Sequence, residues 1–169
     1  MIPMSHDQIA DMLDNTLIGR LALAHPDGRP YAIPLPFCFV NGCLYLRVPM
    51  TGRKGDILSV NNQVCFEIDS YSDQLDDYAS ILMEGRLVAV TDIGEKALVR
   101  AANDAKYNRL RHSHRPGHGR RTPLADLPTR KLIPEIISGR RMDPALRAGV
   151  ASAAGAVWSG SDLDTDQRI

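Results

Sequence analysis

The stretch that decides the fold is Tyr31 to Asn61, which reads YAIPLPFCFVNGCLYLRVPMTGRKGDILSVN. It predicts two strands joined by Asn41-Gly42, because both residues accept the positive φ that a type I′ turn requires. With this turn, Val40 faces Cys43, and period-2 alternation divides the hairpin into two faces. One face is apolar throughout: Ile33, Leu35, Phe37, Phe39, Leu44, Leu46 and Val48. The opposite face is mixed: Ala32, Pro34, Pro36, Cys38, Cys43, Tyr45 and Arg47. The sequence therefore predicts a half-buried antiparallel hairpin.

A basic, glycine-rich segment comes next, Thr51-Gly52-Arg53-Lys54-Gly55-Asp56, and leads into Ile57-Leu58 as the first turn of a short helix. Glycine allows close backbone approach to a ligand, Arg53 offers a planar fork of donors, and Lys54 offers a point charge. A helix N-terminus beside them would add free N–H groups. Taken alone, the segment is either a phosphate site or a solvated basic turn.

Composition restricts the class of protein. The chain has 169 residues, 44% of them hydrophobic, and zero formal net charge. These values are typical of one soluble domain and provide no basic field for nucleic acid. We find no apolar run of membrane-spanning length and no N-terminal signal segment, and therefore expect a cytoplasmic protein. Three cysteines in expected strands, Cys38, Cys43 and Cys65, indicate reduced thiols and no metal site.

The remaining elements follow from periodicity and capping signals. Ser5 and Gln8 form a capping box for a helix that ends near Asn15. A second helix begins at Asp92 and Glu95. Its expected apolar face holds Leu98, Ala101, Ala102, Ala105 and Leu110. Further strands are expected at 16–24, 64–69, 78–90 with a bend at Gly85, and 129–137 with Pro134 at an edge or bulge. The pattern predicts a mainly β, α+β protein built as an antiparallel barrel with helices.

Two segments differ in composition from the rest. Residues 111–121 contain His112, His114 and His118, which could contact a metal or haem, or form a basic rim. We favour a plain loop, because the proline and glycines between them break any rigid ligand geometry. We place the domain at 1–142 and expect a weakly ordered tail at 143–169, in which Val157-Trp158 could dock on a partner subunit.

The order of elements carries a family resemblance. The hairpin, GRKGDIL, NNQVCFEID and YASILMEGRLVAV occur in the sequence and spacing of the pyridoxamine 5′-phosphate oxidase-like FMN-binding split-barrel superfamily. The chain most resembles the nitroimidazole-resistance (Nim-like) branch, over most of Ile9 to Ile137. The resemblance implies an antiparallel split β-barrel that pairs as a homodimer and holds FMN in a groove between the subunits.

The resemblance also implies site residues. Arg53 and Lys54 would bind the FMN phosphate, and Ser80 would contact flavin from the facing subunit. The isoalloxazine ring would lie beside Ala32, Ile33, Pro34 and Leu35, with Val48, Pro49 and Met50 near the ring or ribityl chain. The substrate side would involve Tyr45, Arg47 and Tyr78. No catalytic residue is identified, so any chemistry would be the cofactor's.

Departures from the family pattern limit the function. The oxidases proper carry an Arg and a Lys on the second strand, where this chain has Tyr31 and Pro36, and their C-terminal Arg-x-His signature is absent. Oxidation of pyridoxamine phosphate is therefore not expected. Three hypotheses stay open: an FMN-dependent oxidoreductase that passes electrons from NAD(P)H to a nitro compound or quinone, a non-catalytic flavin-binding protein, and a haem- or F420-binding relative.

Overall fold

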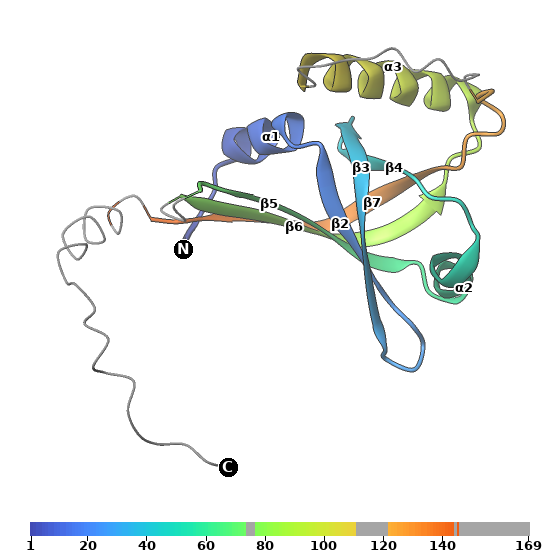
Figure 1. The fold of residues 1–169 in the computed structure, drawn as a ribbon, viewed down its shortest axis with the longest axis horizontal. Coiled ribbons are helices and arrows are strands. Elements are labelled where there is room, and N and C mark those ends of the chain that lie inside the picture. Colours follow the sequence, from blue (N-terminus) through green and yellow to red (C-terminus); the bar gives the residue numbers. More distant parts are fainter. Residues whose placement is uncertain (74–76, 111–121, 144, 146–169) are drawn as a thin grey trace.

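A computed structural model describes residues 1–73, 77–110, 122–143 and 145. The elements in chain order are β1 (Ile2–Pro3), α1 (His6–Asn15), β2 (Ile18–Ala24), β3 (Pro30–Val40), β4 (Cys43–Arg47), α2 (Gly52–Val60), β5 (Gln63–Tyr71), β6 (Tyr78–Ala89), α3 (Ile93–Leu110) and β7 (Thr129–Arg141). Figure 1 shows the strands as one strongly curved sheet, with α1 and α3 over one side and α2 at a separate corner.

The sheet closes into a barrel. Its strand order is β1-β7-β4-β3-β2-β5-β6, all pairs are antiparallel, and β7 also pairs with β6. Six strands therefore form a closed ring, and β1 extends it beside β7. The interior is apolar, with Phe37 and Phe66 packed edge to face at 5.3 Å. This confirms the predicted antiparallel barrel with helices.

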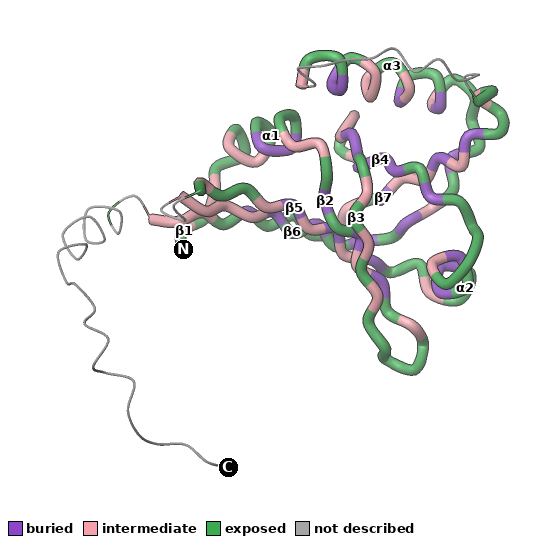
Figure 2. Tube along the Cα trace, viewed as in Figure 1, coloured by how far each residue is buried: buried purple, intermediate pink, exposed green. Residues whose placement is uncertain are grey.

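The Asn41-Gly42 hairpin forms as predicted. Asn41 has a φ of 49° and Gly42 a φ of 76°, and Val40 pairs with Cys43. A half-buried hairpin should expose its mixed face to solvent. In the structure, however, two side chains of this face are buried: Cys38 is 3% and Tyr45 6% exposed. Helix α3 packs against this face, so residues 37–38 and 44–46 of the hairpin are buried, whereas residues 39–43 around the turn stay partly or fully exposed (Figure 2).

The predicted apolar face of α3 is wrong. Leu98 is 49% exposed, and the buried residues of this helix are Lys96, Val99, Lys106 and Tyr107. Lys106 Nζ donates to the carbonyls of Leu13, at 2.7 Å, and Phe37. The lysine stems fill apolar space while their ammonium groups find backbone acceptors, so a polar face becomes the packed one.

Other element bounds differ more modestly. The capping box of α1 is present, with both Ser5 and Gln8 bonds formed. Helix α2 begins at Gly52, so Arg53 and Lys54 lie in its first turn and not in a loop before Ile57. The register shift between β6 and β7 at Glu84/Gly85 confirms the bend, and Pro134 pairs with Gly85 at this bulge.

The predicted domain boundary falls at the end of β7. Arg141 is the last residue of that strand, and Met142 N donates to Tyr78 O at 2.7 Å. The residues after 145 and the histidines at 112, 114 and 118 lie outside the described residues, so the tail and histidine-loop predictions stay predictions.

Candidate functional site

The first turn of α2 presents two cations beside strand β3. Arg53 is exposed and its guanidinium lies 4.7 Å from the centre of the Tyr31 ring. Lys54 Nζ donates to Thr51 O at 3.3 Å. The Thr51 side chain makes no capping bond, so the first-turn N–H groups of α2 have no cap acceptor from it. Open N–H groups beside a free guanidinium form an anion-binding arrangement.

Gly55 allows α2 to approach the preceding segment. A Cβ on Gly55 would lie 2.6 Å from the carbonyl carbon of Met50 and 2.8 Å from its oxygen. The helix therefore packs directly on the backbone of Met50, which is itself 42% exposed. Pro49 is also exposed, whereas the Val48 side chain is buried in the barrel core. Of the three residues expected near a ribityl chain, two offer surface and one offers only backbone.

The four residues of β3 that were predicted to contact the ring also fall into an exposed pair and a core-facing pair. Ala32 and Pro34 are exposed on the outer face, while Ile33 and Leu35 pack against the core. The outer face of β3 from Ala32 to Pro36 therefore carries small side chains over about 13 Å at the rise of an extended strand. Tyr31 belongs to the opposite, core-facing side with Ile33 and Leu35, so Arg53 lies near this end of the strand but against its core-facing side.

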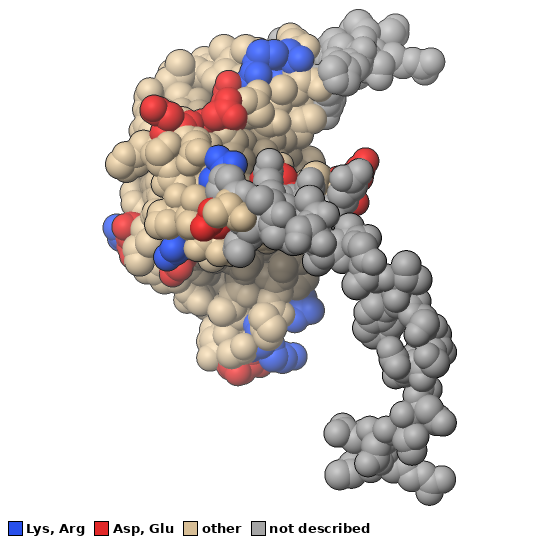
Figure 3. Space-filling view, turned by 90° about the vertical axis from the view of Figure 1, so that its left-hand side faces the viewer, with Lys and Arg blue, Asp and Glu red and all other residues tan. Residues whose placement is uncertain are grey.

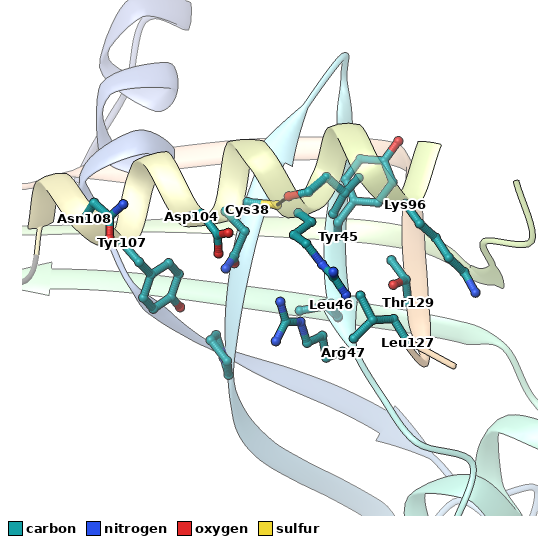
Figure 4. Close-up of a pocket in the computed structure, with 14 residues that line it drawn as sticks. Cys38, Tyr45, Leu46, Arg47, Lys96, Asp104, Tyr107, Asn108, Leu127 and Thr129 are labelled. Atoms are coloured by element: carbon teal, nitrogen blue, oxygen red, sulfur yellow. Dashed lines mark hydrogen bonds between the residues drawn. The ribbon is translucent and has the colours of Figure 1, made fainter. Parts of the chain in front are cut away.

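A cavity of about 280 Å³ lies at the other end, between the outer face of the hairpin and α3 (Figure 4). Pro36 and Arg47 line it from the hairpin, and Arg100 and Asp104 from α3. Figure 4 shows Arg47 below the helix, with Tyr45 on the hairpin side and Asp104 above. The cavity thus combines an apolar wall with groups of both charges.

Tyr45 is a wall of this cavity and not a free donor. Its hydroxyl donates to Glu95 Oε1 at 2.8 Å, and Lys131 Nζ donates to the same oxygen at 2.8 Å. Burial, and then the bond to Glu95, raise the pKa of Tyr45 far above its ordinary value, so the phenol stays protonated. The bond from Lys131 is the main cause that lowers the pKa of Glu95, which stays ionised. The network fixes the ring.

Two predicted site residues lie away from this surface. Ser80 is on β6, and the sheet order places two strands, β2 and β5, between it and β3, about 14 Å at the usual strand spacing. Tyr78 begins β6 and pairs with Tyr71. The opposite end of β6 is the one that lies near β4, because both pair with the first residues of β7. Within one chain, then, Tyr45 and Arg47 share a cavity that Tyr78 does not reach.

The sequence interpretation missed the residues that α3 supplies to the cavity. Lys96, Arg100, Asn103, Asp104 and Tyr107 all line it. Their spacing at intervals of three and four was a usable signal, because it places them on one helix face. The alanines on the opposite face were taken instead as the buried stripe.

Acidic and basic side chains are interspersed on the face in Figure 3, and neither sign forms a continuous patch there. Cys38, Cys43 and Cys65 are free, and burial raises the pKa of the Cys38 thiol to about 11. Within residues 1–73, 77–110, 122–143 and 145, no group of three His, Cys, Asp or Glu side chains could hold a metal ion. No helix in that part is long and apolar enough to cross a membrane.

Comparison with known families now places the chain. The family model described as pyridoxamine 5′-phosphate oxidase matches residues 5–141. The chain therefore belongs to the pyridoxamine 5′-phosphate oxidase-like family, as the sequence resemblance indicated. No curated protein matches the chain.

Solved structures agree on the fold. A candidate 5-nitroimidazole antibiotic resistance protein from Bacteroides thetaiotaomicron has a TM-score of 0.65 at 20% identity, covering 83% of this chain and 86% of its own. The FAD binding protein from Mycobacterium smegmatis has a TM-score of 0.57 at 20% identity, covering 84% and 98%. A protein named F420 reductase has a TM-score of 0.52 at 17% identity, covering 81% and 98%. At these identities, the likeness concerns the barrel fold.

Proposed function

We propose that this chain is an FMN-binding flavoprotein that works as a homodimer and passes reducing equivalents from NAD(P)H to a small acceptor such as a nitro compound or quinone. The observation that carries the proposal is the surface described above. Arg53 lies over Tyr31 at the open N-terminus of α2, near one end of β3, and the small side chains on the outer face of this strand lead to a polar cavity at its other end.

The residues fit a flavin mononucleotide. A phosphate dianion is well held by a guanidinium, an ammonium and open helix N–H groups together. Ala32 and Pro34 are small and exposed, so a flat ring can lie against the β3 backbone without displacing a side chain. When bound, the flavin would supply the hydride and electron transfer.

The chain's own residues would do the rest. Arg47 is exposed at the cavity and carries a charge that would attract and orient an electron-poor, negatively polarised acceptor. Tyr45 would keep its proton on the phenol oxygen, because that hydroxyl is held by Glu95. It would shape the cavity rather than transfer a proton.

The homodimer explains how Ser80 could join the site. One chain leaves two strands between Ser80 and β3, so its proposed flavin contact requires a second copy. The outer face of β6 and β7 offers a surface for this, with Leu82 40%, Ile133 36% and Ile136 56% exposed. Exposed aliphatic side chains grouped on one sheet face are typical of an interface. Leu82→Glu should therefore shift the mass measured by light scattering from dimer to monomer, and an unchanged mass would contradict the dimer.

The first experiment is the absorption spectrum of the purified protein before and after adding FMN, FAD or F420, with the retained cofactor identified by mass. Flavin bands from FMN that survive gel filtration are expected. The relatives named as an FAD binding protein and an F420 reductase make the other two cofactors the specific alternatives. Failure to retain any of the three would overturn the proposal, and a Soret band would favour the haem alternative.

Turnover separates the oxidoreductase from a flavin-binding protein without activity. With cofactor bound, NAD(P)H oxidation should become dependent on an added nitro compound or quinone. Retained flavin without acceptor-dependent oxidation would support the non-catalytic alternative.

A further inference from the structure

Strands β4 and β7 place two hydrogen-bond donors side by side on the wall of the cavity between the hairpin and α3. Arg47 and Thr129 are cross-strand partners, and both line this cavity below α3 (Figure 4). Directly paired residues project from the same face of a sheet, with Cβ atoms about 5 Å apart. The guanidinium fork and the hydroxyl can therefore both reach one small group in the cavity.

Neither of these donors has an acceptor in the part of the chain that the structure describes. Arg47 is exposed at the cavity, whereas Thr129 is only 6% exposed. A buried hydroxyl without an acceptor is unfavourable, so this position favours a ligand that accepts its proton. By contrast, the Lys96 ammonium and the Tyr107 hydroxyl on the same wall each donate to a backbone carbonyl.

The preceding pair on the same two strands shows what such a pair can hold. Tyr45 and Lys131 are also cross-strand partners, and both donate to Glu95 Oε1 at 2.8 Å. A carboxylate from α3 thus bridges a phenol and an ammonium group. Arg47 and Thr129 lie two residues along on the same face of the sheet. No carboxylate of the described residues forms a bond to this second pair.

The size and lining of the cavity restrict the ligand. Its volume of about 280 Å³ exceeds the roughly 150 Å³ that holds a benzene molecule, so one substituted ring fits. Pro36, Val99 and Leu127 supply apolar contacts for a ring. Among the described lining residues, three are cationic and one is acidic, so the cavity favours an anion.

We propose that Arg47 and Thr129 together bind the carboxylate of a single-ring aromatic acid in this cavity. Arg47 supplies charge-assisted N–H donors, and Thr129 supplies its hydroxyl proton. As a statement about substrate, the inference rests on the proposed function: the acceptor would carry a carboxylate, as a nitrobenzoate does. Its nitro group would be reduced to a nitroso group by two electrons from NAD(P)H, with uptake of one further proton and release of one water molecule.

Binding is tested without turnover, by fluorine NMR titration of fluorobenzoate and its neutral counterpart fluorobenzamide with the full-length protein. Fluorobenzoate should bind the parent about 10-fold more tightly than fluorobenzamide. Arg47→Gln should weaken fluorobenzoate binding about 10- to 100-fold, and Thr129→Val about 10-fold, because each removes a donor to a charged group. Arg29→Gln is the matched control. It removes an exposed arginine that does not line the cavity, so binding should be unchanged.

Thr129→Val also separates a binding role from a structural one. Valine has the shape of threonine and removes a buried hydroxyl that has no acceptor, so the Tm should stay the same or rise. Fluorobenzoate binding should fall nevertheless. A lowered Tm would show that the fold itself uses the hydroxyl, which contradicts the proposal. Equal binding by the parent and Arg47→Gln, or of fluorobenzoate and fluorobenzamide by the parent, would overturn it.

The two proposals fail in different ways. A protein that binds fluorobenzoate through Arg47 but retains no flavin keeps this site and loses the proposed oxidoreductase activity. A flavoprotein that reduces nitrobenzene and nitrobenzoate with the same KM, unchanged in Arg47→Gln, keeps the activity and loses the carboxylate site.

Discussion

Helices α2 and α3 both carry cations next to strand β3, but they use them in opposite ways. Lys96 and Lys106 of α3 are 7% and 6% exposed, and their ammonium groups donate to backbone carbonyls. Arg53 of α2 is exposed, and its described contact is with the face of the Tyr31 ring. Cationic side chains therefore anchor α3 to the interior of the fold, whereas on α2 they form an exposed charged surface.

The difference shows how a folding role and a binding role can be separated in this protein. A buried cation must have its donors satisfied within the fold, since an unpaired buried charge is costly. A ligand-binding cation keeps donors available until the ligand arrives. Substitutions in α3 should therefore act on stability, and substitutions in α2 should act on cofactor affinity.

Lys106→Ala should give the largest effect. It removes the donor for Leu13 O and Phe37 O and leaves a void over the Phe37 ring, where Nζ lies 3.8 Å from the ring centre. We expect a loss of about 2–4 kcal/mol in the free energy of unfolding, measured by chemical denaturation. Lys54→Ala is the control, with a change within about 0.5 kcal/mol. Equal losses of stability in the two variants would contradict a folding role that is specific to the buried lysine of α3.

Arg53→Ala should produce the reverse pattern. Loss of a guanidinium contact to phosphate is expected to weaken FMN binding about 10- to 100-fold, measured by fluorescence titration. Stability should fall by no more than about 1 kcal/mol, because only the exposed stacking on Tyr31 is lost. Arg29→Ala, an exposed arginine at the β2–β3 turn, should bind FMN like the parent.

If Arg53→Ala retains FMN as tightly as the parent, the phosphate assignment is wrong. A haem-binding protein would instead keep its ligand in Arg53→Ala and lose it when residues 112–118 are deleted.

The sequence was sufficient for the part of the fold that local rules determine. The Asn41-Gly42 turn fixed the hairpin register, because positive φ and period-2 alternation act over a few residues. The phosphate candidates were also visible, since a basic glycine-rich turn is a local pattern. Helix α2 was nevertheless expected to start later, because glycines at 52 and 55 read as a loop. Gly55 is needed there because α2 packs on the backbone of Met50, and a helical periodicity pattern does not reveal this contact.

Long-range packing was not predictable from the pattern. Lysines on a helix usually face solvent, so Lys96 and Lys106 did not mark the buried face of α3. Their carbonyl partners, on Ala125 and Leu13, are 29 and 93 residues away in sequence. The cavity likewise joins Pro36 and Arg47 to residues of α3. Only the closed barrel and its covering helix bring these groups together.

The pH dependence of stability sharpens the role of Lys106. Burial lowers the pKa of this ammonium group from 10.5 to about 8 in the folded protein. Between these values the unfolded chain binds more protons at this site, so Lys106 alone should raise the free energy of unfolding by about 1 kcal/mol from pH 8 to 9, while the raised pKa of the Cys38 thiol acts in the opposite direction. Lys106→Met should lack this rise, which denaturation of both proteins at the two pH values measures. The same slope in both would show that other groups cause it.

Thr51→Asp tests the open end of α2 with the smallest expected change. Thr51 stands at the N-cap but its side chain makes no capping bond. An aspartate there should accept from the first-turn N–H groups and stabilise the protein by about 1 kcal/mol. It should also weaken FMN binding severalfold, because its carboxylate occupies the donors and repels a phosphate. Thr51→Ala, which removes no cap, should change neither quantity measurably. If Thr51→Asp stabilises the protein and binds FMN as the parent does, the helix terminus is not the phosphate site, and Arg53 would have to act without it.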